Sequence, residues 1–374
     1  MKSTIRICFV TKEIFGWGKY GGFGSYVRLV GTELVKNGFE VYSVIPRSEN
    51  QRAFEQVDGI RVFGLPYPGS LKDSVPSDLV ARALAPFLYS ECRAHIYQSI
   101  NPSFYTLLAQ LASPTAKHLI AFCDLRDIHD WRNIAAAPSL TTFPNRFRTL
   151  PIESPIMRRI VRGAHGSYAL TQILADKALR MYGLRTSPRV VRQPIEIPKR
   201  KMRKSASPLV CFLGRLDPIK RPWLFFDIAR QFPGIDFYVM GQTTEPWRYY
   251  DLIRPYRHLD NLKFLGWTFG DRKSQILEKS WVLVNTSVHE ALPVSFLEAW
   301  AHECAVLSNA NPEGLVKRFG YWARGGNHAE GLRHLLMNNT WRQRGRNGRH
   351  YVETHHDVHS SIKQLIEIYR RILI

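Results

Sequence analysis

Residues 5–46 read IRICFVTKEIFGWGKYGGFGSYVRLVGTELVKNGFEVYSVIP, and this stretch decides the fold. It opens on a short apolar run, residues 5–11, that is typical of a buried strand. A glycine-rich segment follows at residues 20–25, and residues 26–38 repeat apolar side chains at helical spacing up to a final glycine. Residues 39–46 form the next apolar run. Strand, glycine loop, helix and strand in this order predict a βαβ unit of a parallel sheet.

A break in this alternation divides the chain. Residues 192–208 are basic, rich in proline and without periodicity, which is typical of a linker. Strand-like apolar runs resume at residues 209–215, 236–241 and 281–287. A helical pattern at residues 222–232 lies between the first two. The expected fold class is therefore α/β, with two doubly wound, Rossmann-like domains, and residues beyond the carboxyl ends of their strands are the candidates for a site.

The bulk composition limits the class of protein and of partner. The chain has 374 residues, 45% of them hydrophobic and 22% charged, which excludes a disordered chain. A formal net charge of +21 predicts an anionic partner, such as nucleic acid, an acidic membrane surface or a phosphorylated small molecule. The 5 cysteines form no C-x-x-C pair, so we expect no disulfide framework and a cytoplasmic protein. We see neither a signal peptide nor an apolar run long enough to span a membrane.

Two cations follow the first strand of the second half. Arg215 leaves the strand in the segment GRLDPIKRP, and Lys220 follows it at the start of a helix. Both are placed to bind one anion, and a phosphate group is such an anion. Ordinary surface basicity is the alternative in so positive a chain.

Two carboxylates bracket the apolar stretch ALPVSFL, residues 291–297. Glu290 comes just beyond the strand at 281–287, and Glu298 lies more than a turn inside the helix that Pro293 opens. The N–H groups at the start of that helix favour an anion. Because carboxylates accept hydrogen bonds from hydroxyl pairs, the arrangement suits a sugar nucleotide, with hydroxyls at both ends and a diphosphate between them. Alternatively, Glu290 caps the helix and Glu298 is a solvated helix residue.

These stretches together resemble retaining glycosyltransferases of the GT-B fold, in the family numbered four, also described as glycosyl transferases group 1. Glu290 and Glu298 match the E-x(7)-E motif, and GRLDPIK, residues 214–220, matches the phosphate-binding G-R-L-x-x-x-K element. YGGFGSYVRLVGTELVKNGFEV, residues 20–41, is similar to the N-terminal glycine loop and helix. The motifs occur in the family's order over nearly the whole chain. The resemblance implies two Rossmann-like domains that face a cleft, with a C-terminal helix that returns to the first.

The resemblance also implies a domain order and a reaction. The reaction would be the transfer, with retention, of a hexosyl group from a nucleoside-diphosphate sugar to a hydroxyl of a saccharide or lipid-linked acceptor. Such a step would belong to the assembly of cell-surface polysaccharide or glycolipid. The implied domains are an N-terminal acceptor-side domain at residues 1–195, a linker at 196–207, a nucleotide-sugar-binding domain at 208–355 and a C-terminal helix at 356–374.

Each matched residue receives a role from the resemblance. Arg215 and Lys220 would hold the donor diphosphate and neutralise the charge on the leaving group. Glu298 would accept hydrogen bonds from ribose hydroxyls, and Glu290 would contact hydroxyls of the transferred sugar. The other implied substrate contacts are Leu292, Pro293 and Val294 toward the sugar and phosphates, Gly266 near the base, and Gly22, Phe23 and Gly24 in the loop of the first domain.

The strand HLIAFCDLRD departs from the family, whose members often have a histidine after it. Here Cys123 or Asp124 stands near that place, and His129 is expected in the following loop. We name Asp124 and His129 as catalytic candidates; alternatively, Asp124 and Asp127 pair with Arg126 or other neighbours for structural reasons. No D-x-D triplet occurs, so we expect neither a metal nor another cofactor, and the cationic pair would take the place of a metal.

A further basic segment suggests where the protein is located in the cell. Residues 144–163, PNRFRTLPIESPIMRRIVRG, mix basic and apolar side chains, which suits an anionic membrane surface. A solvated helix face over ordinary core is the alternative. We expect a sugar-nucleotide donor, a saccharide or lipid-linked acceptor and a peripheral position on the inner face of a membrane, without nucleic acid. Another GT-B enzyme, such as a sugar-nucleotide epimerase or a phosphorylase, and a non-catalytic basic module that binds a membrane or a polyanion are the other functions left open.

Overall fold

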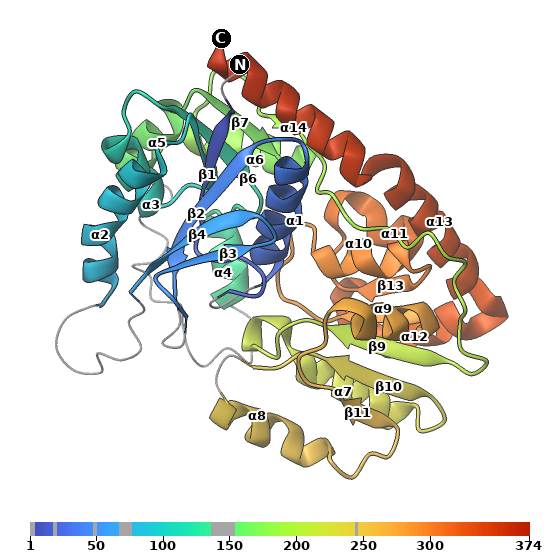
Figure 1. The fold of residues 1–374 in the computed structure, drawn as a ribbon. Helices are drawn as coiled ribbons and strands as arrows, with labels where there is room; N and C mark the ends of the chain where they lie inside the picture. Colours follow the sequence, from blue (N-terminus) through green and yellow to red (C-terminus); the bar gives the residue numbers. More distant parts are fainter. Residues whose placement is uncertain (1–3, 18–20, 48–50, 67–76, 136–153, 244–245) are drawn as a thin grey trace. The chain divides into compact units, whose positions relative to one another are not determined.

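The chain forms two compact units in a computed structural model (Figure 1), which describes residues 4–17, 21–47, 51–66, 77–135, 154–243 and 246–374. The first unit comprises Met1–Asp127, Pro144–Pro194 and Val358–Ile374, and the second comprises Ile128–Phe143 and Ile195–Asp357. The chain therefore leaves the first unit twice and returns to it twice. No helix within the described ranges is long and apolar enough to cross a membrane.

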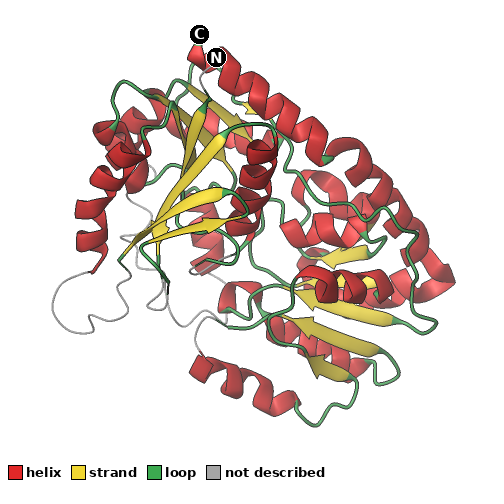
Figure 2. Cartoon of the chain, viewed as in Figure 1, coloured by secondary structure: helices red, strands yellow, loops and turns green. Residues whose placement is uncertain are grey.

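The first unit is built on one sheet with the strand order β3-β4-β2-β1-β5-β6-β7-β8. Its neighbouring strands are parallel except for the antiparallel pair β3 and β4. The central strands β1, β2, β5 and β6 are almost wholly buried because helices cover both faces of the sheet (Figure 2). The strands are β1 (Arg6–Val10), β2 (Glu40–Pro46), β3 (Phe54–Val57), β4 (Ile60–Leu65), β5 (Ile96–Ile100), β6 (Lys117–Phe122), β7 (Gly166–Ala169) and β8 (Arg189–Val190).

The helices of the first unit correct one expectation. The glycine-rich segment was expected to be a loop, but helix α1 already begins at Gly22, so Phe23 and Gly24 lie in its first turn. The Glu13 carboxylate accepts a hydrogen bond from the Gly24 N–H (3.2 Å), which satisfies one of the unpaired N–H groups of that turn. The helices are α1 (Gly22–Lys36), α2 (Ser77–Cys92), α3 (Phe104–Ala112), α5 (Pro155–Arg162), α6 (Gln172–Tyr182) and α14 (Val358–Leu373).

The C-terminal helix α14 packs on the first unit, as expected. Tyr369 of α14 is fully buried, and its hydroxyl donates a hydrogen bond to Oε1 of Gln98 on β5. The Gln98 amide donates in turn to the hydroxyl of Tyr168 (2.7 Å), which is hydrogen-bonded to Tyr26 of α1 (2.6 Å). This buried polar chain joins α14, the sheet and α1, and each member satisfies its neighbour.

The second unit has a wholly parallel sheet with the order β11-β10-β9-β12-β13-β14. Its strands are β9 (Leu209–Leu213), β10 (Asp236–Met240), β11 (Leu262–Phe264), β12 (Val282–Asn285), β13 (Ala305–Ser308) and β14 (Gly320–Trp322). Its helices are α4 (Ile128–Ala135), α7 (Pro222–Gln231), α8 (Pro246–Ile253), α9 (Gly270–Lys279), α10 (Val294–Ala301), α11 (Leu315–Phe319), α12 (His328–Leu336) and α13 (Thr340–His355). The strand order reverses between β9 and β12, which is where open α/β sheets bind ligands.

Helix α4 corrects a second expectation. His129 was expected in a loop, but it lies in the first turn of α4 and is exposed. The helix is grouped with the second unit although the chain around it belongs to the first. Asp130 of α4 lies 3.6 Å from Nδ1 of His289, which follows β12 in that unit.

Candidate active site

The carboxyl ends of β9 and β12 lie side by side because the two strands are parallel neighbours. Lys220 follows β9 and Glu290 follows β12, and the two side chains meet with Nζ and Oε1 2.6 Å apart. They are 70 positions apart in the sequence, so only the sheet topology brings them together. Glu290 also accepts a hydrogen bond from Nδ2 of Asn285 (2.9 Å), the last residue of β12.

The charge state of Glu290 follows from these partners. Its side chain is only 8% exposed, and burial alone raises the pKa of a carboxyl group. The ammonium of Lys220 and the hydrogen bonds from Ser287 and Asn285 outweigh burial, so the pKa of Glu290 lies below its ordinary value. Glu290 is thus a buried carboxylate at neutral pH rather than the helix cap that was the structural alternative. Helix α10 receives no side-chain cap at all.

A short turn holds Lys220 in place. Arg221 fastens this turn, and the sequence analysis did not identify it as a site residue. Arg221 has a left-handed backbone (φ +45°) directly before Pro222, which is a strained position for a residue with a side chain. Its Nε donates a hydrogen bond to the carbonyl oxygen of Thr286 (2.7 Å). The hydroxyl of Thr286 donates to the carbonyl oxygens of Lys220 (2.8 Å) and Arg221 (2.9 Å). These bonds fasten the turn to the end of β12.

We expect Arg221→Ala and Arg221→Gly to lose this fastening. Each should lower the free energy of unfolding by about 1.5–3 kcal/mol, as for a hydrogen bond that involves a charged group. The glycine variant should be the more stable of the two by about 1 kcal/mol, because glycine tolerates the left-handed backbone. Urea unfolding measures both. Equal stability of the two variants would show that the turn is not strained, and glycine at wild-type stability would show that the guanidinium is not needed.

Arg215 takes a different position from Lys220. Its Nε lies 3.1 Å from a carboxylate oxygen of Asp217, and its side chain is 42% exposed. Within the described part of the second unit, Arg215 has no ion pair with Glu290 or Glu298. The structure therefore brings Lys220, not Arg215, to Glu290.

Glu298 is also paired rather than solvated. It lies inside α10, and its Oε1 is 2.5 Å from Nζ of Lys273 on α9, with 17% of the glutamate side chain exposed. His302 links the same two helices, since its ring bonds the carbonyl oxygen of Glu298 (2.7 Å) and the hydroxyl of Ser274 (2.9 Å). Burial lowers the pKa of His302 to about 4, so this link is made by a neutral ring at neutral pH. The solvated alternative for Glu298 is wrong.

The other predicted contacts surround this edge of the sheet. Leu292 is buried, Pro293 is the N-cap of α10 and Val294 is its first residue, half-buried. The unpaired N–H groups of that first turn give a place for an anion. Gly266 follows β11 with φ +65°, and a Cβ there would meet no atom within 4 Å, so backbone conformation rather than space explains the glycine. Trp267 beside it is 42% exposed.

Asp124 lies in the first unit, and its neighbours match the structural alternative. Its carboxylate is 2.9 Å from the guanidinium of Arg126, and Asp127 lies 3.4 Å from Lys177. The side chain of Asn101 accepts hydrogen bonds from the N–H groups of Cys123 and Asp124. Within the described ranges, no group of three potential metal-ligating side chains lies together.

Two family models match separate parts of the chain. Residues 195–325 match the family described as glycosyl transferases group 1, and residues 6–154 match the starch synthase catalytic domain. The chain has the GT-B fold, and these two matches support a glycosyltransferase. No curated protein sequence matches this glycosyltransferase.

Several solved structures share the fold of this glycosyltransferase over nearly its whole length. Sucrose-phosphate synthase from Thermosynechococcus elongatus has a TM-score of 0.76 at 16% identity, over 98% of this chain and 99% of that one. WaaG, a glycosyltransferase involved in lipopolysaccharide biosynthesis, has a TM-score of 0.68 at 15% identity, over 97% of this chain and 99% of that one. The catalytic domain of starch synthase IV from Arabidopsis thaliana has a TM-score of 0.65 at 12% identity, over 99% of this chain and 100% of that one. At these identities the likeness shows the fold.

Proposed function

We propose that this glycosyltransferase moves a hexosyl group, with retention, from a nucleoside-diphosphate sugar to a hydroxyl of a saccharide or lipid-linked acceptor. The observation that carries the proposal is the buried pair of Lys220 and Glu290 at the carboxyl ends of β9 and β12. A cation and a carboxylate held together beside the first turn of α10 can meet a phosphate and a sugar hydroxyl of one molecule. Starch synthase IV, which shares the fold, was determined with ADP and acarbose bound.

Each side chain of the second unit has a proposed task in this reaction. Lys220 stabilises the negative charge that builds on the departing diphosphate, and Arg215 contributes a second positive charge. Glu290 accepts hydrogen bonds from the transferred sugar, and Glu298 accepts them from the ribose. These cations act in place of a metal. The departing phosphate takes the proton of the acceptor hydroxyl, so no separate base is required.

The acceptor is proposed to bind the first unit, with the enzyme peripheral on the inner face of a membrane and active in cell-surface polysaccharide or glycolipid assembly. The support is the net charge of +21 and the basic helix α5, where Met157, Ile160 and Val161 are buried while Ile156 is 66% exposed. Anionic lipid attracts such a surface. The basic residues Arg146 and Arg148 of the same segment lie outside the described residues.

A thermal-shift screen of uridine-, guanosine- and adenosine-diphosphate sugars tests the donor site. The true donor should raise the melting temperature of the wild type by mass action. The donor should raise the melting temperature of Glu298→Ala far less, because the ribose contact is lost. Glu313→Ala, which removes a carboxylate outside the site, should respond as the wild type does. Absence of a shift with every donor would contradict the proposal. Formation of an epimer from the donor alone would favour an epimerase.

A further inference from the structure

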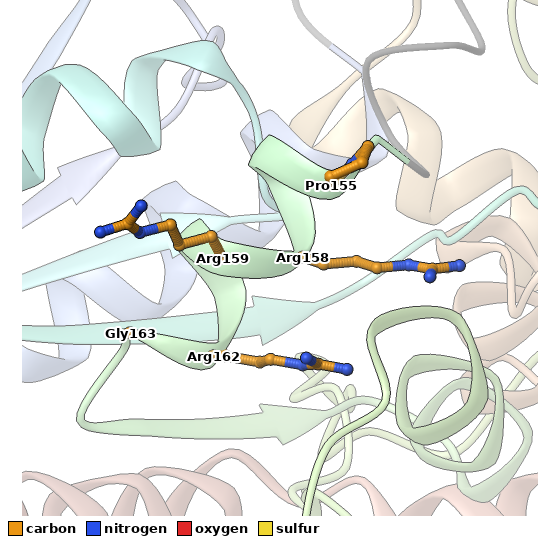
Figure 3. A pocket seen from close by; sticks show the side chains of 5 residues that line it. All are labelled: Pro155, Arg158, Arg159, Arg162 and Gly163. Carbon is orange, nitrogen blue, oxygen red and sulfur yellow. The ribbon is translucent and has the colours of Figure 1, made fainter.

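Helix α5 of the first unit carries a cluster of arginines that the proposed reaction does not use. Arg158, Arg159 and Arg162 are exposed and line a hollow of about 530 Å³ together with Pro155 and Gly163 (Figure 3). No carboxylate lies within salt-bridge distance of these three guanidinium groups in the described residues. The hollow is therefore positively charged and lacks a counter-charge there.

Two of the three side chains are fixed by the neighbouring helix. Nε of Arg158 donates to the carbonyl oxygen of Met181 (3.1 Å), and Nε of Arg162 donates to that of Tyr182 (2.7 Å). Both carbonyls belong to the last turn of α6, where they have no helical partner. In Figure 3 the two side chains extend in the same direction, and Arg159 extends the other way.

These two bonds leave most of the N–H donors of Arg158 and Arg162 for a ligand. A guanidinium group carries five N–H donors, and the structure describes a bond for only one of them in Arg158 and in Arg162. Like charges four positions apart on a helix repel one another, so the pair is unfavourable on its own. An oxyanion that takes hydrogen bonds from both groups would remove the repulsion and match their planar geometry.

Gly183 shows that the position of Arg162 depends on the end of α6. The glycine has φ +57°, and a Cβ on it would lie 2.3 Å from Nη2 of Arg162. A larger residue would therefore be strained and would displace the guanidinium. The end of α6 thus supplies both the carbonyl that binds Arg162 and the space through which it passes.

Arg158 and Arg162 lie at the edge of the sheet opposite to the one where substrates are expected to bind. Helix α5 ends just before β7, and α6 follows β7 and runs back along it. Because β7 is parallel to β6 and β8, the end of α6 lies at the amino-terminal edge of the sheet. Substrates of open parallel sheets bind at the opposite edge. The arginine pair is thus distinct from an acceptor site at the carboxyl edge.

We propose that Arg158 and Arg162 form a binding site for a phosphate group, separate from the donor and acceptor sites. The phosphate belongs either to a dissolved phosphorylated molecule or to a lipid headgroup. The proposal does not depend on the proposed donor chemistry, because all of its residues lie in the first unit.

Calorimetric titration with pyrophosphate tests the site in solution. Wild type and Arg370→Gln/Arg371→Gln, which removes two positive charges at exposed positions of α14, should bind alike. Arg158→Gln/Arg162→Gln should lose this binding component, with a dissociation constant at least about tenfold higher. The donor-site contribution is the same in all three proteins, so it cancels in the comparison. If the double glutamine variant does not fold, Arg158→Lys/Arg162→Lys keeps the charge but removes the planar fork, and it should also bind more weakly.

Sedimentation with vesicles separates the two sources of the phosphate. Vesicles of phosphatidylcholine with phosphatidic acid should retain the wild type, and those of phosphatidylcholine alone should not, if the phosphate is a lipid headgroup. A difference in pyrophosphate binding alone would assign the site to a dissolved ligand. A folded arginine variant that matches the wild type with both probes would overturn the proposal. The donor-induced rise in melting temperature, measured on the same proteins, reports the second unit independently.

Discussion

Replacement of Lys220 by alanine is expected to lower kcat/KM for the sugar donor by about a hundredfold to a thousandfold. The side chain is proposed to offset negative charge that develops only as the diphosphate departs, so its loss should appear mainly in kcat. Steady-state kinetics with the donor found by thermal shift measure the effect. Unchanged kinetics would remove Lys220 from the reaction.

The same variant should also be less stable, and this effect must be separated from catalysis. Lys220→Ala leaves the Glu290 carboxylate, 8% exposed, without its cation. Removal of one partner of a buried ion pair lowers the free energy of unfolding by about 3 kcal/mol. Lys220→Ala/Glu290→Gln removes the unpaired charge and should recover most of that stability, as measured by urea unfolding. Recovery of activity along with stability would mean that Lys220 serves only to balance Glu290.

The pH dependence of stability gives a second check on this pair. In the wild type the pKa of Glu290 in the folded protein is lowered. The ion pair therefore stabilises the protein fully above the pKa of glutamate in the unfolded chain, and this stabilisation is lost as the pH falls through the lower pKa of the folded protein. Without Lys220, burial should raise the pKa of Glu290 instead. The difference in stability between the two proteins should therefore shrink as pH falls from 7 toward about 4, near the ordinary pKa of glutamate.

The sequence predicted this edge of the sheet because apolar runs mark strands and the ligand-binding edge follows from parallel pairing. Arg215 and Lys220 after β9, and Glu290 after β12, were placed correctly with respect to strand ends. Their pairing could not be foreseen, since no pattern tells which of two nearby cations reaches a carboxylate 70 positions away. That choice depends on the turn at Arg221, whose strained backbone has no sequence signature.

The partner of Glu298 was missed for a related reason. Lys273 lies in the highly charged helix GDRKSQILEK, where any of several side chains could have faced α10. Only the packing of α9 against α10, fixed by His302 and Ser274, selects it. The error at His129 was one of local structure: a helix of 8 residues begins at Ile128, and its Asp130, rather than His129, faces His289.

Glycine content misled the prediction at the start of α1. Glycine is a weak helix former, so a run of glycines favours a loop in any reading of local preference. The helix nevertheless begins at Gly22, where Glu13 accepts a hydrogen bond from the Gly24 N–H and compensates part of that weakness. The contact comes from the segment after β1, and local sequence preference does not include it.

Trp300→Ala is expected to lower the free energy of unfolding by about 3–5 kcal/mol, as for other large aromatic residues removed from a core. Trp300 is fully buried in α10, two positions after Glu298, and packs edge-on against Phe296 and Phe319. Its indole N–H donates to the carbonyl oxygen of Phe319 (3.2 Å). Trp300→Phe keeps an aromatic ring but loses that bond, so its stability in urea unfolding should fall between the other two. Equal stability of all three proteins would contradict the packing described.

Gly348 of α13 allows a sharper test of the same contact. A Cβ on Gly348 would lie 2.5 Å from Cδ1 of the Trp300 indole but 3.1 Å from the Cβ of Trp300. Gly348→Ala should therefore destabilise the wild type by steric overlap, although alanine is by itself the better helix former by about 1 kcal/mol. In the Trp300→Ala protein the indole is absent, and the same change should cost less. The two effects must then be non-additive, because the residues are in contact. Additive free energies of unfolding would show that α10, with its Glu298, is not held against α13 through this tryptophan.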